Sequence, residues 1–274
     1  MSGELVYAYA VVRAAAVPDD LLEGLRGVAG APVHVLCDTG PGNTGAAGTG
    51  LGALVSPVPA ADFDEAPLRA RLEDLPWLER TARAHQRVVD TVASAACVLP
   101  MRLATVYRGE AKVRAVLAGD RERFGSALGA LDGRIEWGVK VYADLSGSPG
   151  GEDSPERAAP AAAGRTAASG RDYLRQRGAA RRARDERLRR AEEMTGRVHG
   201  ALSELAERAC LHRPQDSRLS GREGENLLNA AYLVPRERAS EFALRVDELA
   251  ERSAGLRVEL TGPWAPYSFA GEAV

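Results

Sequence analysis

Hydrophobic periodicity divides the first half of the chain into strands and helices of a mixed fold. Residues 5–12 are rich in β-branched and aromatic side chains, which predicts a buried strand. A short helix is expected over residues 18–26, because its leucines share one face. Further strands are predicted at residues 33–37 and 52–58.

A long amphipathic helix is predicted to begin near Asp74, with Pro76 in its first turn. Its apolar stripe consists of Leu78, Ala82, His85, Val89, Val92 and Ala96. A strand at residues 101–107 and another helix at residues 109–131 follow. The order strand, helix, strand, strand, helix, strand predicts a ferredoxin-like unit, a four-stranded antiparallel sheet with helices on one face.

The second half of the chain predicts a β-α-β-α-β unit with one long helix. Its expected elements are strand 135–142, helix 171–211, strand 226–234, a helix opening at Pro235 and strand 256–260. Residues 145–170 are rich in Ser, Gly, Pro and Ala without periodicity, which indicates a flexible insertion. The predicted fold class is therefore α+β, with an N-terminal domain at residues 1–133 and a C-terminal domain at residues 134–274.

Composition and charge are those of an ordinary globular protein. Of 274 residues, 45% are apolar and 27% charged, and the net charge of −2 gives no overall basic field for nucleic acid. The three cysteines are widely spaced, which favours a reducing cytosol over a disulfide framework. No signal peptide or run of roughly 18 apolar residues is visible, so we expect a cytoplasmic protein without a membrane span.

Two segments leave alternative functions open. Residues 40–45 match GxGxxG inside a Gly-rich loop at 39–52, but the next expected element is a strand rather than the helix that a dinucleotide site needs. A flexible loop is the favoured interpretation, and small-molecule binding is the alternative. Residues 171–190 hold nine arginines, which favours a solvated helix face and leaves RNA binding as the second alternative.

No catalytic, cofactor or metal site emerges from the remaining motifs. His85 lies on an apolar helix face, where a packed histidine is the usual case. Cys210 and His212 could supply two metal ligands, but a structural zinc needs four. We therefore expect no catalytic residues, no cofactor and no metal.

An aromatic tail is the last feature. Trp264, Tyr267 and Phe269 follow a Gly262-Pro263 turn within six residues. Such a cluster either locks the tail onto the protein's own core or forms a partner-binding patch. Internal docking is the favoured interpretation because unanchored chain ends fray. The three aromatic residues are nevertheless the best candidates for partner binding.

Several segments together resemble the gas vesicle protein F/L family (GvpF/GvpL). The matching segments are residues 7–12, Ala84-His85 with Arg87, 99–107 (Leu-Pro-Met-Arg to Thr-Val-Tyr), 136–142 (Glu-Trp-Gly-Val-Lys-Val-Tyr), 170–174 (Gly-Arg-Asp-Tyr-Leu), 229–235 (Asn-Ala-Ala-Tyr-Leu-Val-Pro) and 260–269 (Leu-Thr-Gly-Pro-Trp-Ala-Pro-Tyr-Ser-Phe). Two departures are Leu103-Ala104, where the family usually has Phe-Gly, and Ala265, where a second Pro is common.

The resemblance implies two α+β domains and a role in gas vesicle formation without catalysis. It implies that the protein is an assembly factor or minor structural component on the gas vesicle or in the cytoplasm. The implied partners are the small hydrophobic shell protein and other gas vesicle accessory proteins, with no nucleic acid. A soluble binder would shield the aggregation-prone apolar face of a shell subunit until it assembles.

Overall fold

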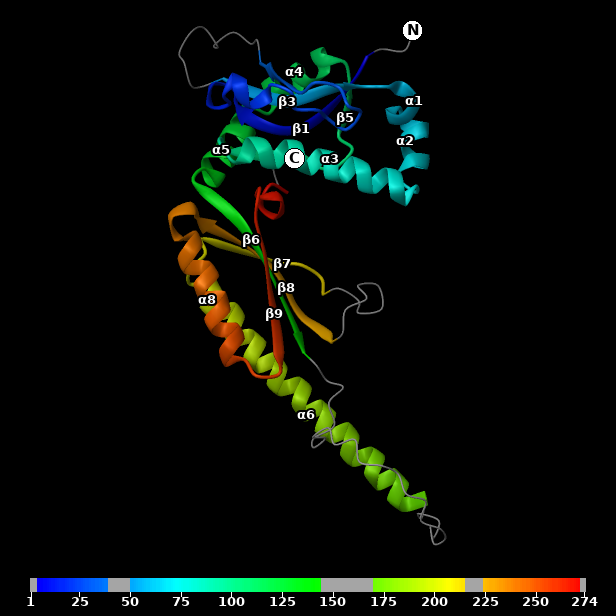
Figure 1. Cartoon of the computed structure of the whole chain (residues 1–274), viewed down its shortest axis with the longest axis vertical. Helices are drawn as coiled ribbons and strands as arrows, with labels where there is room; N and C mark the ends of the chain where they lie inside the picture. Colours follow the sequence, from blue (N-terminus) through cyan, green and yellow to red (C-terminus); the bar gives the residue numbers. More distant parts are fainter. Residues whose placement is uncertain (1–3, 39–49, 144–169, 215–223, 272–274) are drawn as a thin grey trace. The chain divides into compact units, whose positions relative to one another are not determined.

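The computed structural model describes residues 4–38, 50–143, 170–214 and 224–271 (Figure 1). Its contacts divide the chain into two compact units. Unit 1 comprises Met1–Trp137, Leu233–Ala239 and Gly262–Val274, and unit 2 comprises Gly138–Tyr232 and Ser240–Thr261. The chain thus passes between the units four times, whereas the sequence predicted one boundary after residue 133. Whether residues 1–133 and 134–274 fold as separate domains stays a prediction.

The predicted α+β class is confirmed by two antiparallel sheets with packed helices. The sheet of unit 1 has the order β2-β3-β1-β4, with β5 also paired to β1. Its strands are β1 (Leu5–Arg13), β2 (His34–Cys37), β3 (Leu51–Val58), β4 (Val98–Pro100) and β5 (Val106–Arg108). This order is compatible with the predicted ferredoxin-like arrangement.

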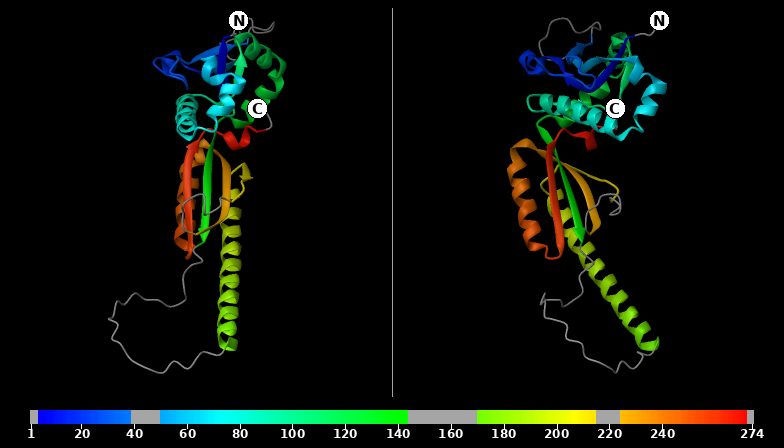
Figure 2. Two further views of the ribbon diagram at one scale, coloured as in Figure 1. Left: turned by 90° about the vertical axis from the view of Figure 1, so that its right-hand side faces the viewer. Right: turned by 45° about the vertical axis from the view of Figure 1, so that its right-hand side comes forward.

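Helices cover both faces of this sheet, whereas the sequence predicted helices on one face only. The helix α3 (Leu75–Ala93) lies on one side, and α4 (Glu110–Gly119) and α5 (Arg121–Leu131) lie on the other (Figure 2). The two layers explain why β1 is buried from Leu5 to Val12 without alternation. The short helices α1 (Ala60–Phe63) and α2 (Glu65–Arg71) precede α3.

Helix α3 begins where the sequence placed it. The Asp74 side chain accepts a hydrogen bond from the Trp77 amide at 3.2 Å, as an N-cap residue does. The buried face of α3 consists of Trp77, Thr81, His85, Val88, Val89 and Val92. It packs on the core side of β1, which carries Tyr7 and Tyr9.

Three sequence-predicted elements of unit 1 differ from the structure. The helix expected over residues 18–26 is only a 3-10 turn, Asp19–Leu22. The helix expected over 109–131 is broken at Asp120 into α4 and α5. Of the strand expected over 101–107, only residues 106 and 107 are in a strand, β5. Residues 103–104 form a turn, where the Tyr7 hydroxyl accepts a hydrogen bond from the Ala104 amide at 2.9 Å.

Unit 2 has a four-stranded sheet of order β7-β8-β6-β9. Its strands are β6 (Arg134–Ala143), β7 (Arg208–Leu211), β8 (Glu225–Pro235) and β9 (Leu256–Trp264). The helices α6 (Gly170–Ser203) and α8 (Ala239–Arg252) cover the same face, because Tyr232 of β8 contacts both His199 and Phe242. The helix predicted to reach residue 211 ends at Ser203, since the following segment pairs with β8 as β7.

The Ala104 turn gives a first testable prediction. Ala104 has a φ of 64°, in the left-handed region that disfavours side chains. We expect Ala104→Gly to stabilise the protein by about 0.5–1 kcal/mol, because relief of strain exceeds the added chain entropy. Urea unfolding measures the change, and Ala104→Val should destabilise by more than about 1 kcal/mol. A destabilising Ala104→Gly would contradict the strained turn.

Candidate functional site

The C-terminal tail is docked on unit 1. Ala265, Phe269 and Ala270 are buried, each 9% exposed or less. The Ser268 amide and hydroxyl both donate hydrogen bonds to the Glu136 carboxylate, at 2.8 and 2.7 Å. Glu136 is itself buried, so these two bonds help to satisfy a charge that would be costly inside the protein.

The three tail aromatics have different environments. Phe269 is buried, and Tyr267 is half-buried with its ring centroid 6.2 Å from that of His85. Trp264, in contrast, is 42% exposed, so internal docking was the wrong expectation for this residue. Tyr267 and Phe269 therefore anchor the tail, and Trp264 is the tail aromatic that a partner can reach.

Gly262 fixes how the chain enters the tail. Its φ is 119°, and a Cβ there would lie 3.0 Å from the Glu136 carbonyl oxygen and 3.2 Å from ring atoms of Trp137 and Trp264. Both the backbone conformation and the close approach require glycine. Gly262 therefore lies directly against the backbone of β6 at Glu136, two residues before Trp264.

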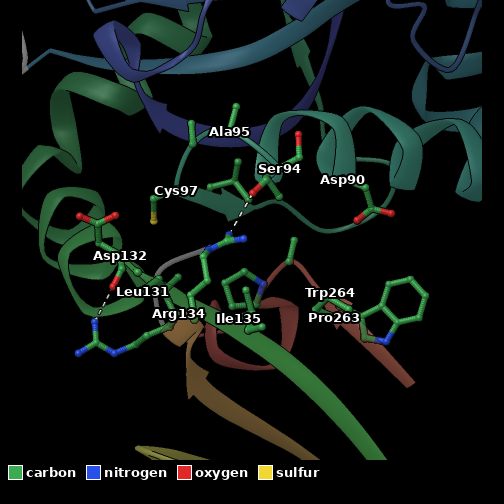
Figure 3. Close-up of a pocket in the computed structure, with 17 residues that line it drawn as sticks. Asp90, Ser94, Ala95, Cys97, Leu131, Asp132, Arg134, Ile135, Pro263 and Trp264 are labelled. Carbon is green, nitrogen blue, oxygen red and sulfur yellow. Dashed lines mark hydrogen bonds between the residues drawn. The ribbon is translucent and has the colours of Figure 1, made fainter. Parts of the chain in front are cut away.

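Trp264 lies at the edge of a groove of about 670 Å³ in unit 1 (Figure 3). Nine of its lining residues are small or apolar and come from the α3 end, β4, the α5–β6 turn and the tail. They are Ala93, Ala95, Ala96, Val98, Leu131, Ile135, Pro263, Ala265 and Pro266. Such a surface suits apolar side chains of a partner, with Trp264 as the large aromatic contact.

Polar groups at the groove are mostly used within the protein. The Arg236 guanidinium donates to the Ala93 carbonyl oxygen at 3.4 Å, and the Arg134 guanidinium donates to that of Asp132 at 2.7 Å. Burial raises the pKa of the Asp90 carboxyl, which Gln86 partly offsets by donating a hydrogen bond at 2.7 Å. The Cys97 thiol donates to the Leu128 carbonyl oxygen, and burial raises its pKa to about 11, so it stays protonated at neutral pH.

His85 is a packed residue, as the sequence predicted. It is 3% exposed, and its Nδ1 lies 3.0 Å from the Tyr7 hydroxyl. Burial lowers its pKa to about 4, although the Met101 backbone favours the charged form. Burial also raises the pKa values of Tyr7, Tyr9 and Tyr267. The cluster is therefore uncharged at neutral pH.

This histidine predicts an acid-sensitive fold. Between the unfolded pKa of about 6.5 and the folded pKa of about 4, the unfolded chain binds the proton more tightly. Stability is complete above pH 6.5 and falls as the pH drops through this window. The free energy of unfolding of the wild type should fall between pH 7.5 and 4.5. We expect this fall to be about 2 kcal/mol smaller in His85→Gln, as measured by urea unfolding at the two pH values. An equal loss in both proteins would show that His85 titrates normally.

None of the other segments that the sequence singled out contributes a lining residue to the groove among the described residues. The Gly-rich loop at 39–52 lies outside the described residues except for its end, where β3 rather than a helix follows. The insertion at 145–170 lies outside them up to Gly170, where α6 begins. The Arg-rich segment 171–190 forms the first half of α6.

Neither a metal-ligand cluster nor a membrane-spanning helix occurs in the described part of the chain. There, no three His, Cys, Asp or Glu side chains gather as metal ligands, and Cys210 and His212 belong to no such group. Within the same residues, no helix is both long and apolar enough to cross a membrane.

Sequence reasoning named Trp264 but missed the groove beside it. The sequence predicted Ala96 on the apolar stripe of the helix, whereas α3 ends at Ala93 and Ala95 and Ala96 line the groove. Arg236 was also missed, because its position beside Ala93 depends on a chain crossing that no local pattern indicates.

Comparison with known proteins places the chain in a family. The model of the gas vesicle synthesis protein GvpL/GvpF family matches residues 5–271. Gas vesicle protein L of Streptomyces sp. (strain CB03234) is 51% identical over 97% of this chain and 93% of its own length. Gas vesicle protein F of the same strain is 30% identical over 79% of this chain and 86% of its own length.

Solved structures share the fold. The crystal structure of GvpF from Anabaena sp. PCC7120 has a TM-score of 0.65 at 18% identity and covers 97% of this chain and 96% of its own. The crystal structure of GvpF from Microcystis aeruginosa has a TM-score of 0.63 at 19% identity and covers 98% of this chain and 99% of its own. With a family match over nearly its whole length, the chain belongs to the gas vesicle synthesis protein GvpL/GvpF family and has a role in gas vesicle formation.

Proposed function

We propose that this protein is a non-enzymatic assembly or minor structural protein that binds the small hydrophobic gas vesicle shell protein. The observation that carries the proposal is the exposed Trp264 at the edge of a groove of mixed apolar and charged lining, in a chain of this family. A shell subunit presents a large apolar face before assembly, and the alanines, prolines and Trp264 that line part of the groove suit contact with such a face.

Contacts within the protein hold two walls of the groove. Its tail wall is fixed by the buried Phe269 and by the Ser268–Glu136 hydrogen bonds. Its opposite wall is the end of α3, which is covered by the Arg236 side chain. A preformed surface loses little conformational entropy when a partner binds, which favours affinity. The same groove is the proposed contact for the shell protein on the gas vesicle or in the cytoplasm; other accessory proteins are further proposed partners.

Co-expression with the shell protein tests the proposal. We expect an affinity-tagged chain to retain the shell protein through purification and to keep it from precipitating. Circular dichroism of the purified chain verifies its fold. Failure of a folded chain to retain the shell protein would contradict the proposal. Nucleotide-dependent thermal stabilisation or salt-sensitive RNA binding would instead favour one of the two alternative functions.

A further inference from the structure

The first half of α6 forms an exposed basic helix in unit 2. No residue between 174 and 190 is buried, and the first buried side chain of α6 is Ala191. Figures 1 and 2 show this half of the helix running past the sheet that its second half covers. We call residues 174–190 the α6 arm. A helical segment without a fully buried side chain gains little stability from tertiary packing, so a partner is an expected source of further stability.

The charge of the α6 arm differs from that of the rest of the chain. The arm holds eight arginines against Asp185 and Glu186, a net charge of +6. Since the whole chain carries −2, everything outside the arm carries −8. Arg189 and Arg190 pair with Glu186, whereas the exposed Arg181, Arg182 and Arg184 lie on the part of the arm farther from the sheet. Another copy of this chain therefore offers the opposite charge.

Unit 1 has a surface that matches the arm. Residues 60–83 hold six carboxylates against four arginines, a net charge of −2. Arg71 pairs with Asp62 and Asp74, and Arg83 pairs with Glu79, which leaves Glu73 as the exposed carboxylate nearest Leu72. Where α2 meets α3, the exposed Glu73 and Glu79 lie among Leu72 and Leu75, which are 40% and 73% exposed. We call these four residues the α2–α3 corner. Its acidic and apolar character complements the arm, where Leu174 is 68% exposed among arginines.

We propose that the protein associates head to tail with a second copy of itself, through the α6 arm of one copy and the α2–α3 corner of the next. Because the two surfaces differ, the contact is heterologous and can repeat along a row of copies. This inference is independent of the groove and of shell-protein binding. The attraction is between exposed charges, so salt weakens it.

Charge reversal on each surface tests the proposal by sedimentation velocity on the full chain. We expect concentration-dependent association in about 50 mM salt that is lost in about 500 mM salt. An arm variant (R181E, R182E and R184E) and a corner variant (E73R and E79R) should each raise the dissociation constant about tenfold or more. Mixing the two variants should restore association, because the acidic arm of one then faces the basic corner of the other.

Matched controls separate this contact from general charge effects. R26E, R197E and R252E together change the net charge as much as the arm variant does, and we expect association to persist. Leu75→Gln and Leu174→Gln leave the charge unchanged and should each weaken association. Circular dichroism verifies that every variant is folded.

Several results would overturn the inference. A wild-type chain that is monomeric at every concentration in low salt would do so. So would association that is indifferent to both charge reversals, or a mixture of the two variants that stays monomeric. Binding of RNA to the arm by a chain that remains monomeric would assign the arm to a different partner.

Discussion

Replacing Trp264 with alanine is expected to weaken shell-protein binding by about 2 kcal/mol or more, roughly thirtyfold in Kd, as at an interface hot spot. The free energy of unfolding should change by less than about 1 kcal/mol, because the side chain is 42% exposed and leaves no core cavity. Titration against shell protein kept in solution by detergent measures the first quantity, and urea unfolding measures the second.

Leu244→Ala is the matched control for Trp264→Ala. Leu244 is a large apolar residue on α8 and is 64% exposed, outside the groove. The Leu244→Ala variant should leave both the affinity for the shell protein and the free energy of unfolding unchanged. If Trp264→Ala binds the shell protein like the wild type, the groove is not its contact. If Trp264→Ala instead unfolds at much lower urea, the indole is part of the core.

Replacing Phe269 with alanine should have the largest effect on stability, about 3 kcal/mol. Phe269 is 9% exposed and anchors the tail within unit 1, so its truncation leaves a cavity under the tail. Urea unfolding measures the loss, and shell-protein binding should also weaken because the tail forms one wall of the groove.

Ser268→Ala tests the docking of the same tail with a smaller change than Phe269→Ala. It removes the hydroxyl that donates to Glu136 at 2.7 Å but keeps the amide that donates at 2.8 Å. We expect a smaller loss, about 1–2 kcal/mol, as for a hydrogen bond to a buried charged group. A Phe269→Ala protein with an unaltered unfolding midpoint would show that the tail does not stabilise unit 1.

Local patterns were sufficient where one element carries its own signals. Helix α3 was predicted from its Asp74 cap, its proline and an apolar stripe of which His85, Val89 and Val92 are buried, all signals that are local in the sequence. Strand β1 and the buried His85 followed equally from residue type and periodicity. The family, too, was identified from short segments of sequence, and the comparison with known proteins confirms it.

Tertiary contacts decided the features that join distant segments. The end of α6 at Ser203 reflects pairing of β7 with β8, which outweighs the helical pattern that continues in the sequence. The turn at residues 103–104 is hydrogen-bonded to the Tyr7 hydroxyl, and the site of tail docking depends on Glu136. The partners lie more than ninety residues apart in each case, a separation that no local window spans.

The sequence by itself determined the fold class, the family and the aromatic tail as the candidate contact, because periodicity and motifs are properties of neighbouring residues. Only the tertiary structure decided which aromatic is exposed. Tyr267 and Phe269 face the core of unit 1, and Trp264 does not, because Gly262 and the Glu136–Ser268 hydrogen bonds fix the course of the tail. The groove likewise exists only where α3, the α5–β6 turn and the tail meet.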